Sequence, residues 1–400
     1  MKSILLFSFN DLPYRLKQCF LYCSLFPEDH VIVNNRLISL WIAEGFVEHV
    51  EGLTPEKVAN GYLMELIFRN MLQQRFRGPL PACKMHDLLR EIALSIAKQE
   101  KFCAVHDGGS ETTEETGALR LSIQTTNGEI GSCTGISRLR SFLVFATAVS
   151  SFSFPNKLPF DLKLLTVLDL EDVPIDNLPD NLTSLFNLKF LNLSRTPIRE
   201  LPESIGKLRN LQTLNITLTK IVALPRGISK LINLRHLLVG RFIFGNFIGV
   251  RIPSSISKMK KLQSLAYIES EGNSIRLVGK MTQLKNVGIT NVKERDAEDL
   301  CASIQEMKVL SSLGLIVAEG EEFLRVDALS SPPPYLDILD LVGKLEKGVE
   351  HLTELQQYRF DNVSEKFRES IKEGGVDHPR MLLVDERCKK YTNKSRSSSS

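Results

Sequence analysis

A histidine and an aspartate stand side by side near the end of the first hundred residues, in Met85-His86-Asp87. An imidazole beside a carboxylate can move protons or activate a nucleophile when a serine, a cysteine or a metal ion lies nearby. The sequence contains none of HExxH, C-x-x-C or GxSxG, so no motif supplies such a companion and we expect no enzyme. The pair also stands where a helix should begin, where it could either hold an anion such as a phosphate or simply start the helix.

Cys19 and Cys23 have the spacing of neighbours on one face of a helix. No second Cys/His pair stands at the spacing of a zinc site, so we expect both thiols to pack in a core and no metal to bind. The 7 cysteines are odd in number and scattered, which indicates a reducing compartment. No apolar run approaches the roughly 20 residues that cross a bilayer, and the apolar stretch 4–9 is too short for a secretory signal. We therefore expect a cytoplasmic protein with no transmembrane segment, and peripheral association with the plasma membrane is the alternative.

The segment that must position these residues, 11–104, has the pattern of a winged-helix domain. Asp11 should cap a first helix, Asn34 or Asn35 a second that Gly45 ends, and Thr54-Pro55 a third. Two strands are expected at 71–76 and 82–85, and a fourth helix at about 86–98. An acidic linker, 105–117, should connect this domain to the C-terminal part of the chain.

Leu165, Leu188, Leu211 and Leu234 follow one another at intervals of 23 residues. Each begins L-x-x-L-x-L or a close variant, and the first three repeats then carry Leu-Pro, which is the pattern of leucine-rich repeats. About seven buried aliphatic side chains at roughly 2 kcal/mol each cannot offset the ordering of one unit alone, so the units must stack. The expected fold is an α+β winged-helix domain followed by an α/β leucine-rich-repeat solenoid, a horseshoe, over 118–360, with an irregular or disordered tail at 361–400.

Repeat arrays usually act as binding surfaces, and the side chains that face outward from the strands are the candidates for protein contacts. Phe190 is the one large aromatic residue among them, and exposed aromatic residues often anchor interfaces. The alternative is that most of these side chains are solvated or contact the preceding domain. The candidate partner-binding residues are Lys189, Phe190, Asn192, Gln212, Asn215, Arg235 and His236.

The overall charge is nearly balanced, with 50 basic residues against 47 acidic ones, so no polyelectrolyte partner is indicated. A winged helix can bind DNA through its third helix. That segment mixes Glu56 and Glu65 with Lys57 and Arg69, which is a poor basis for phosphate contacts. We therefore expect no nucleic-acid partner.

Three stretches together resemble plant disease-resistance proteins of the coiled-coil, nucleotide-binding (NB-ARC), leucine-rich-repeat class. They are CFLYCSLFPED (19–29), LISLWIAEGFV (37–47) and Met85-His86-Asp87. The resemblance implies that 11–104 is the winged-helix part of the NB-ARC module and that 1–10 is a remnant of its helical subdomain. It also implies that His86, supported by Asp87, lies beside the phosphates of ADP in a complete module. The repeats would recognise a pathogen effector or a guarded host protein and restrain the module in innate immunity.

The chain departs from that family because it lacks the phosphate loop G-x-x-x-x-G-K-[ST]. We expect it to bind no cofactor alone, although family members bind ADP or ATP, and to be the C-terminal part of a receptor from a truncated gene or an incomplete gene model. A further partner would be the NB-ARC module of a relative, and we hypothesise that the surface around Lys189 and Arg235 docks on it. The alternatives are an adaptor or decoy that works without a nucleotide switch, or a nonfunctional truncated paralogue.

Overall fold

The computed structural model describes residues 2–78, 80–106, 117–125, 138–146, 162–243, 246–318, 324–325, 333–343, 345–347, 357–361 and 369. They belong to two compact units, one of residues 1–198 with 210–214 and one of residues 199–209 with 215–400. Most of the predicted linker (107–116) lies outside the described residues, as does the predicted tail apart from 361 and 369.

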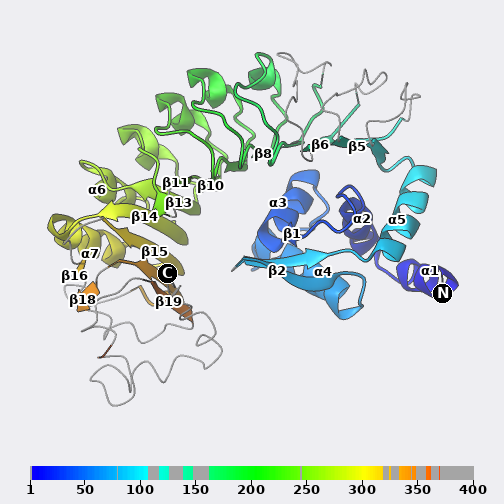
Figure 1. Ribbon diagram of the computed structural model, residues 1–400, viewed down its shortest axis with the longest axis horizontal. Helices are drawn as coiled ribbons and strands as arrows, with labels where there is room; N and C mark the ends of the chain where they lie inside the picture. The colour runs from blue at the N-terminus through cyan, green and yellow to red at the C-terminus, as the bar shows by residue number, and fades with distance from the viewer. Residues whose placement is uncertain are drawn as a thin grey trace, which may run out of the picture. The chain divides into compact units, whose positions relative to one another are not determined.

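The first unit begins with helices and a small antiparallel sheet (Figure 1). Its elements are α1 (Lys2–Asn10), α2 (Tyr14–Cys23), β1 (Ile32–Val33), α3 (Asn34–Glu44), α4 (Pro55–Phe68), β2 (Gln73–Arg77), β3 (Leu80–Lys84) and α5 (Asp87–Gln99). The sheet has the strand order β1-β3-β2. Phe20, Trp41 and Leu66 are fully buried and form the centre of a core that also contains Cys19 and Cys23. The three helices, hairpin and helix of a winged-helix domain are therefore present, and both thiols pack in the core as predicted.

The helix ends test the capping predictions. Thr54 caps α4 by accepting a hydrogen bond from the Lys57 N–H at 3.4 Å, and Gly45 ends α3 with a φ of 82°. Asp11 does not cap α2, because that helix starts after Pro13 and the Asp11 carboxylate pairs with Arg69 at 3.0 Å. The prediction that an asparagine caps α3 was also wrong. Val33 precedes the helix, because strand β1 runs directly into it.

The first unit continues into parallel strands. They are β4 (Ala104–His106), β5 (Arg120–Thr125), β6 (Ser141–Ala146), β7 (Val167–Asp169) and β8 (Phe190–Asn192), and they are neighbours in that order. Leu165 and Leu188, which begin two repeats, are fully buried. A short 3-10 helix, η1 (Leu182–Ser184), connects β7 to β8. The strand–turn unit expected from the 23-residue pattern is what the chain forms here.

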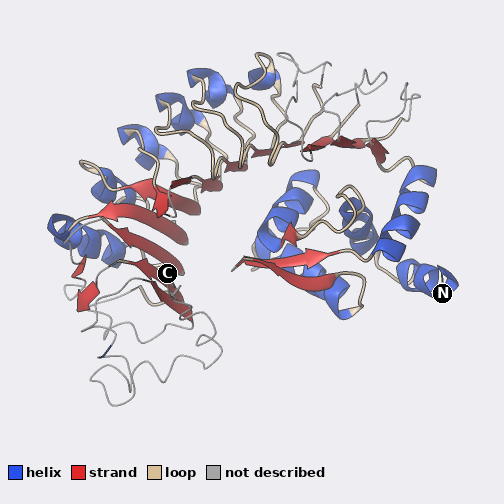
Figure 2. Cartoon of the chain, viewed as in Figure 1, coloured by secondary structure: helices blue, strands red, loops and turns tan. Residues whose placement is uncertain are grey.

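The second unit repeats the same strand and turn. Its parallel neighbours are β10 (His236–Leu238), β13 (Ser264–Glu269), β14 (Asn286–Val292), β15 (Ser312–Val317), β17 (Ile338–Val342) and β19 (Gln357–Asp361). The connections contain η2 (Glu203–Lys207), η3 (Arg226–Lys230), η4 (Ser254–Lys258), α6 (Ser274–Gly279), η5 (Glu294–Asp296) and α7 (Ala297–Glu306), and Figure 2 shows them as helices beside the strands. The remaining strands are β9 (Thr213–Asn215), whose residues fall in both units, the pair β11 (Arg241–Ile243) and β12 (Asn246–Ile248), and the pair β16 (Leu324–Arg325) and β18 (Leu345–Lys347).

Candidate functional site

A polar residue ends three of the repeat strands at the same position. The side-chain oxygens of Asp169 and Asn192 accept hydrogen bonds from the N–H groups two residues further on, at 3.3 and 3.1 Å, and Asn215 repeats this turn at 3.1 Å. Such a turn fixes the direction in which the chain leaves the strand. The residue that follows the N–H donor has a positive φ, which is 62° at Asp172 and 62° at Arg195. At the end of β7, this turn fixes the positions of the carboxylates of Asp169, Glu171 and Asp172.

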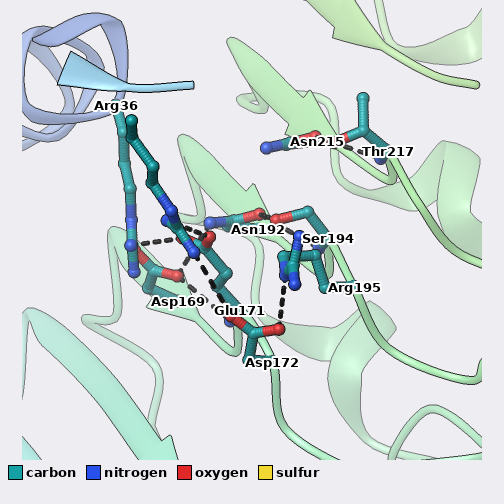
Figure 3. A network of polar contacts seen from close by, with 10 residues as sticks. Arg36, Asp169, Glu171, Asp172, Asn192, Ser194, Arg195, Asn215 and Thr217 are labelled. Atoms are coloured by element: carbon teal, nitrogen blue, oxygen red, sulfur yellow. Dashed lines mark hydrogen bonds and ion pairs between the residues drawn. The ribbon is translucent and has the colours of Figure 1, made fainter. Parts of the chain in front are cut away.

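Helix α3 lies against these strand ends within the first unit (Figure 3). The Arg36 guanidinium donates to the Asp169 carboxylate through Nε at 2.8 Å and through a terminal nitrogen at 2.8 Å. Another terminal nitrogen of Arg36 pairs with Glu171. The Asp169 side chain is fully buried and that of Arg36 is only 8% exposed. The contact is therefore a buried, multidentate ion pair, the strongest class of such contacts in protein interiors.

Further residues extend this network outward. Arg77 of β2 pairs with Glu171 at 2.8 Å and with Asp172 at 3.6 Å. The Asn192 amide nitrogen donates to Asp169 Oδ1 at 2.9 Å, so the neighbouring repeat also holds the central carboxylate. Two elements of the winged-helix domain, α3 and β2, thus contact the end of the same repeat strand.

The pKa values in the network follow from burial and from the two arginines. Burial alone would raise the pKa of Glu171, but Arg36 and Arg77 outweigh it and lower that pKa below the usual range. Burial alone would lower the pKa of Arg36, and the two carboxylates raise it instead. The pKa of Asp169 is raised, because burial and the nearby Glu171 oppose the effect of Arg36. Arg36 is therefore shared between two buried carboxylates, and Asp169, the deeper of them, is incompletely compensated.

A second buried ion pair lies at the other end of α3, with the charges reversed. Arg120 of β5 donates to the Glu44 carboxylate at 2.7 Å, and the side-chain exposures are 6% and 0%. The Ser141 hydroxyl of β6 donates to the other Glu44 oxygen. The Arg120 guanidinium lies over the rings of Phe46 and Phe102, 5.0 and 4.1 Å from their centroids. One helix therefore offers a cation and an anion to complementary charges on the repeat strands.

Apolar side chains fill the space around the two ion pairs. Phe145, Val167 and Phe190 of the repeat strands belong to the same buried cluster as Phe20 and Trp41 of the winged-helix domain. Phe190 is 2% exposed, and its neighbour Asn192 is fully buried. The prediction that these two residues face a solvent-exposed binding surface was wrong. Contacts between α3 and strands β7 and β8 cover that face, which is the alternative that the sequence had left open.

The other predicted partner-binding residues remain at least partly accessible. Lys189, Gln212, Asn215, Arg235 and His236 are all half-buried, and the His236 ring nitrogen lies 3.1 Å from the Ser264 hydroxyl. Their role in partner binding stays a prediction.

Comparison with known proteins decides the family. The "Leucine-rich repeat region" family matches residues 138–371, and the "Disease resistance protein Winged helix domain" family matches residues 25–93. "Disease resistance protein RPM1" of Arabidopsis thaliana is 45% identical over 377 residues, which are 90% of this chain and 40% of that protein. The chain belongs to the plant disease-resistance family of leucine-rich-repeat proteins. It spans less than half of the length of RPM1.

Other relatives of this disease-resistance chain carry similar names. "Disease resistance protein Pik-2" of Oryza sativa subsp. japonica is 35% identical over 174 residues, which are 41% of this chain and 16% of that protein. Among solved structures, the Leptospira interrogans leucine-rich-repeat protein LIC12759 has a TM-score of 0.44 and 19% identity, over 67% of this chain and 71% of that chain. The family and the fold class predicted from the sequence are confirmed.

The histidine of the disease-resistance motif begins helix α5. His86 is the capping residue, and its ring nitrogen Nδ1 accepts a hydrogen bond from the Leu88 N–H at 3.3 Å. The His86 side chain is exposed, whereas Asp87 Oδ1 is buried and has no hydrogen-bond partner among the residues that the structure describes. The exposed ring at the N-terminus of a helix is compatible with an anion site, whereas the Asp87 carboxylate cannot itself donate to an anion.

The cysteines of the disease-resistance winged-helix domain are chemically inert. Burial raises the pKa of Cys83 to about 12 and that of Cys103 to about 11, and it also raises the pKa of Cys23 well above its ordinary value. In the described part of the chain, no helix combines the length and the apolar character that crossing a bilayer requires.

Proposed function

We propose that this chain is the recognition and restraint part of an intracellular plant immune receptor. Its relatives are named disease-resistance proteins, which supports a role in plant defence. In this proposal the repeats bind a protein, either a pathogen effector or a guarded host protein. The contact between α3 and the repeat strands then holds the winged-helix domain in its resting position.

The observation that carries this proposal is the pair of buried ion pairs on α3, Arg36 with Asp169 and Glu44 with Arg120. A buried charge that loses its partner destabilises the protein by about 3–5 kcal/mol. The two ion pairs therefore tend to form together or separate together. The opposite polarity at the two ends of α3 admits only one orientation of the helix on the strands. These are the properties that a restraint between two domains needs.

The test joins the nucleotide-binding part of RPM1 to this chain and expresses the chimera in leaf tissue. Arg36→Glu should cause cell death without an elicitor, because it places a third carboxylate beside Asp169 and Glu171. The exchange of Arg36→Asp with Asp169→Arg should restore silence. Arg276→Glu is the matched control, because Arg276 forms an exposed ion pair with Asp299 in the second unit.

If the Arg36→Glu chimera accumulates normally, stays silent and still responds to the elicitor, the restraint role is wrong. An adaptor or decoy that works without a nucleotide switch would then be the better description.

Within the same proposal, His86 contacts the phosphates of ADP when the chain is part of a complete nucleotide-binding module, and Asp87 supports it. The exposed His86 ring at the start of a 13-residue helix supports this role. The chain alone lacks the phosphate-loop motif, so we expect no calorimetric signal when ADP is added to it. Micromolar affinity of the isolated chain for ADP would contradict this expectation.

A further inference from the structure

The second unit contains an open depression with a strongly one-sided charge. Its volume is about 520 Å³, and four of its eight lining residues are basic while none is acidic. The basic residues are Arg235, Lys260, Lys261 and Lys285. Gln263 and Gln283 add amide groups, and Val309, which is 40% exposed, adds an apolar side chain.

Backbone hydrogen bonds hold the floor of this depression in a row. Gln263 N–H donates to the Arg235 carbonyl at 2.7 Å, and Lys285 N–H donates to the Gln263 carbonyl at 2.8 Å. The row continues to Ser311, whose N–H donates to the Lys285 carbonyl at 2.8 Å. Neighbouring parallel strands lie about 4.8 Å apart, so the backbones of Arg235 and Lys285 are about 10 Å apart. Two of the four cations, Arg235 and Lys285, are therefore held on a rigid row of backbone.

The described part of the second unit gives the three lysines of the depression no acidic partner. Lys261 donates to the Asn233 side-chain oxygen at 2.7 Å, which is an uncharged partner. In the part of the second unit that the structure describes, Lys260 and Lys285 form no ion pair. Their positive charge is available to a ligand.

We propose that this depression binds an extended acidic polypeptide segment of a protein partner. A single phosphate or carboxylate is too small to meet cations that are spread over about 10 Å, whereas alternate side chains of an extended peptide are about 7 Å apart. The lining contains no aromatic side chain on which nucleic-acid bases could stack. This inference rests on the proposed function, because it specifies the chemistry of a protein that the repeats recognise.

The test uses the full chain and a short fluorescent peptide in which Glu alternates with Ser. A control peptide has Gln in place of each Glu. The double variant Lys260→Glu with Lys285→Glu should weaken binding of the acidic peptide by about tenfold or more, since attraction becomes repulsion at two positions. The dependence of binding on salt should also become weaker.

The matched control is Lys207→Glu with Lys220→Glu, which makes the same change in net charge at exposed positions of the second unit. It should leave peptide binding within about twofold of the wild type. Thermal unfolding verifies that both variants are folded. If the charge-reversal variant fails to fold, the double variant Lys260→Gln with Lys285→Gln takes its place. It removes both charges and should also weaken binding of the acidic peptide.

Three results would overturn the proposal. They are equal binding of the Glu and Gln peptides, equal loss in the control variant, and binding of pyrophosphate or of phosphatidylserine vesicles without binding of the peptide. None of them would alter the expected behaviour of Arg36→Glu in the chimera, which depends on the first unit alone. Failure of the acidic-peptide site is therefore distinguishable from failure of the proposed function.

Discussion

The two units use charged side chains on their repeat strands in opposite ways. In the first unit, Arg36 and Glu44 of α3 are sealed against opposite charges, and every side chain in the two central pairs is less than a tenth exposed. In the second unit, Lys260 and Lys285 line an open depression that contains no acidic residue. Charges that are buried and paired fix the position of one element on another. Charges left open on the same kind of scaffold are available for a partner from outside.

Breaking a sealed pair should have the largest effect. Arg120→Ala leaves the Glu44 carboxylate buried without its cation and removes the contacts of the guanidinium with two aromatic rings. We expect the free energy of unfolding to fall by about 3–5 kcal/mol, measured by urea denaturation of the full chain.

The control for this prediction is Arg276→Ala, which breaks an ion pair whose side chains are 66% and 40% exposed. Its expected cost is about 0–1 kcal/mol. Equal costs for the two variants would mean that burial does not distinguish the two kinds of charge, and the comparison would fail.

The sequence predicts the repeat strands well because their signal is local. The leucines at 23-residue spacing are buried and lie two residues before successive strands, and Gly45 and Thr54 stop and start helices through their own backbone and side-chain chemistry. Such features depend on residues a few positions apart. They need no knowledge of the tertiary fold.

The covered face was missed because alternation along a strand shows which side chains point outward but not what lies on them. The ion pair between Arg36 and Asp169 joins residues that are 133 positions apart, and no local pattern predicts it. A signal was nevertheless present in the outward position of successive repeats. It is apolar at Val167 and Phe190 and becomes polar at Thr213 and His236. Two adjacent apolar outward residues indicate a face that another element covers.

Acidification should loosen the sealed region by a smaller amount. The His30 ring packs against the rings of Phe26 and Phe145, with centroid distances of 5.5 and 5.3 Å. Burial, assisted by Arg36, lowers the pKa of His30 from 6.5 to about 4. Between these values the unfolded chain binds more protons than the folded one, so the free energy of unfolding decreases as the pH falls through this window. The contribution of neutral His30 to the free energy of unfolding is complete above pH 6.5 and is lost as the pH falls towards about 4. We expect this loss to be about 1–2 kcal/mol, after allowance for the partial exposure of the His30 side chain.

His30→Phe should flatten this part of the stability profile, because a phenyl ring fills the same apolar site and does not titrate. Urea denaturation between about pH 7 and about pH 5 measures the difference while Glu171, whose pKa is lowered from 4.5, stays ionised. An unchanged slope in His30→Phe would show that other groups cause the acid response.

The smallest effect on stability should come from the lysines of the open depression. Lys260→Ala with Lys285→Ala removes two cations that form no ion pair in the described part of the second unit, so neither change leaves a buried charge without a partner. We expect the free energy of unfolding to stay within about 0.5 kcal/mol of the wild type in urea. Binding of the acidic peptide should nevertheless weaken, which separates a recognition role from a structural one. If the double variant instead loses as much stability as Arg120→Ala, the lysines stabilise the repeats themselves, and the contrast between sealed and open charges would no longer hold.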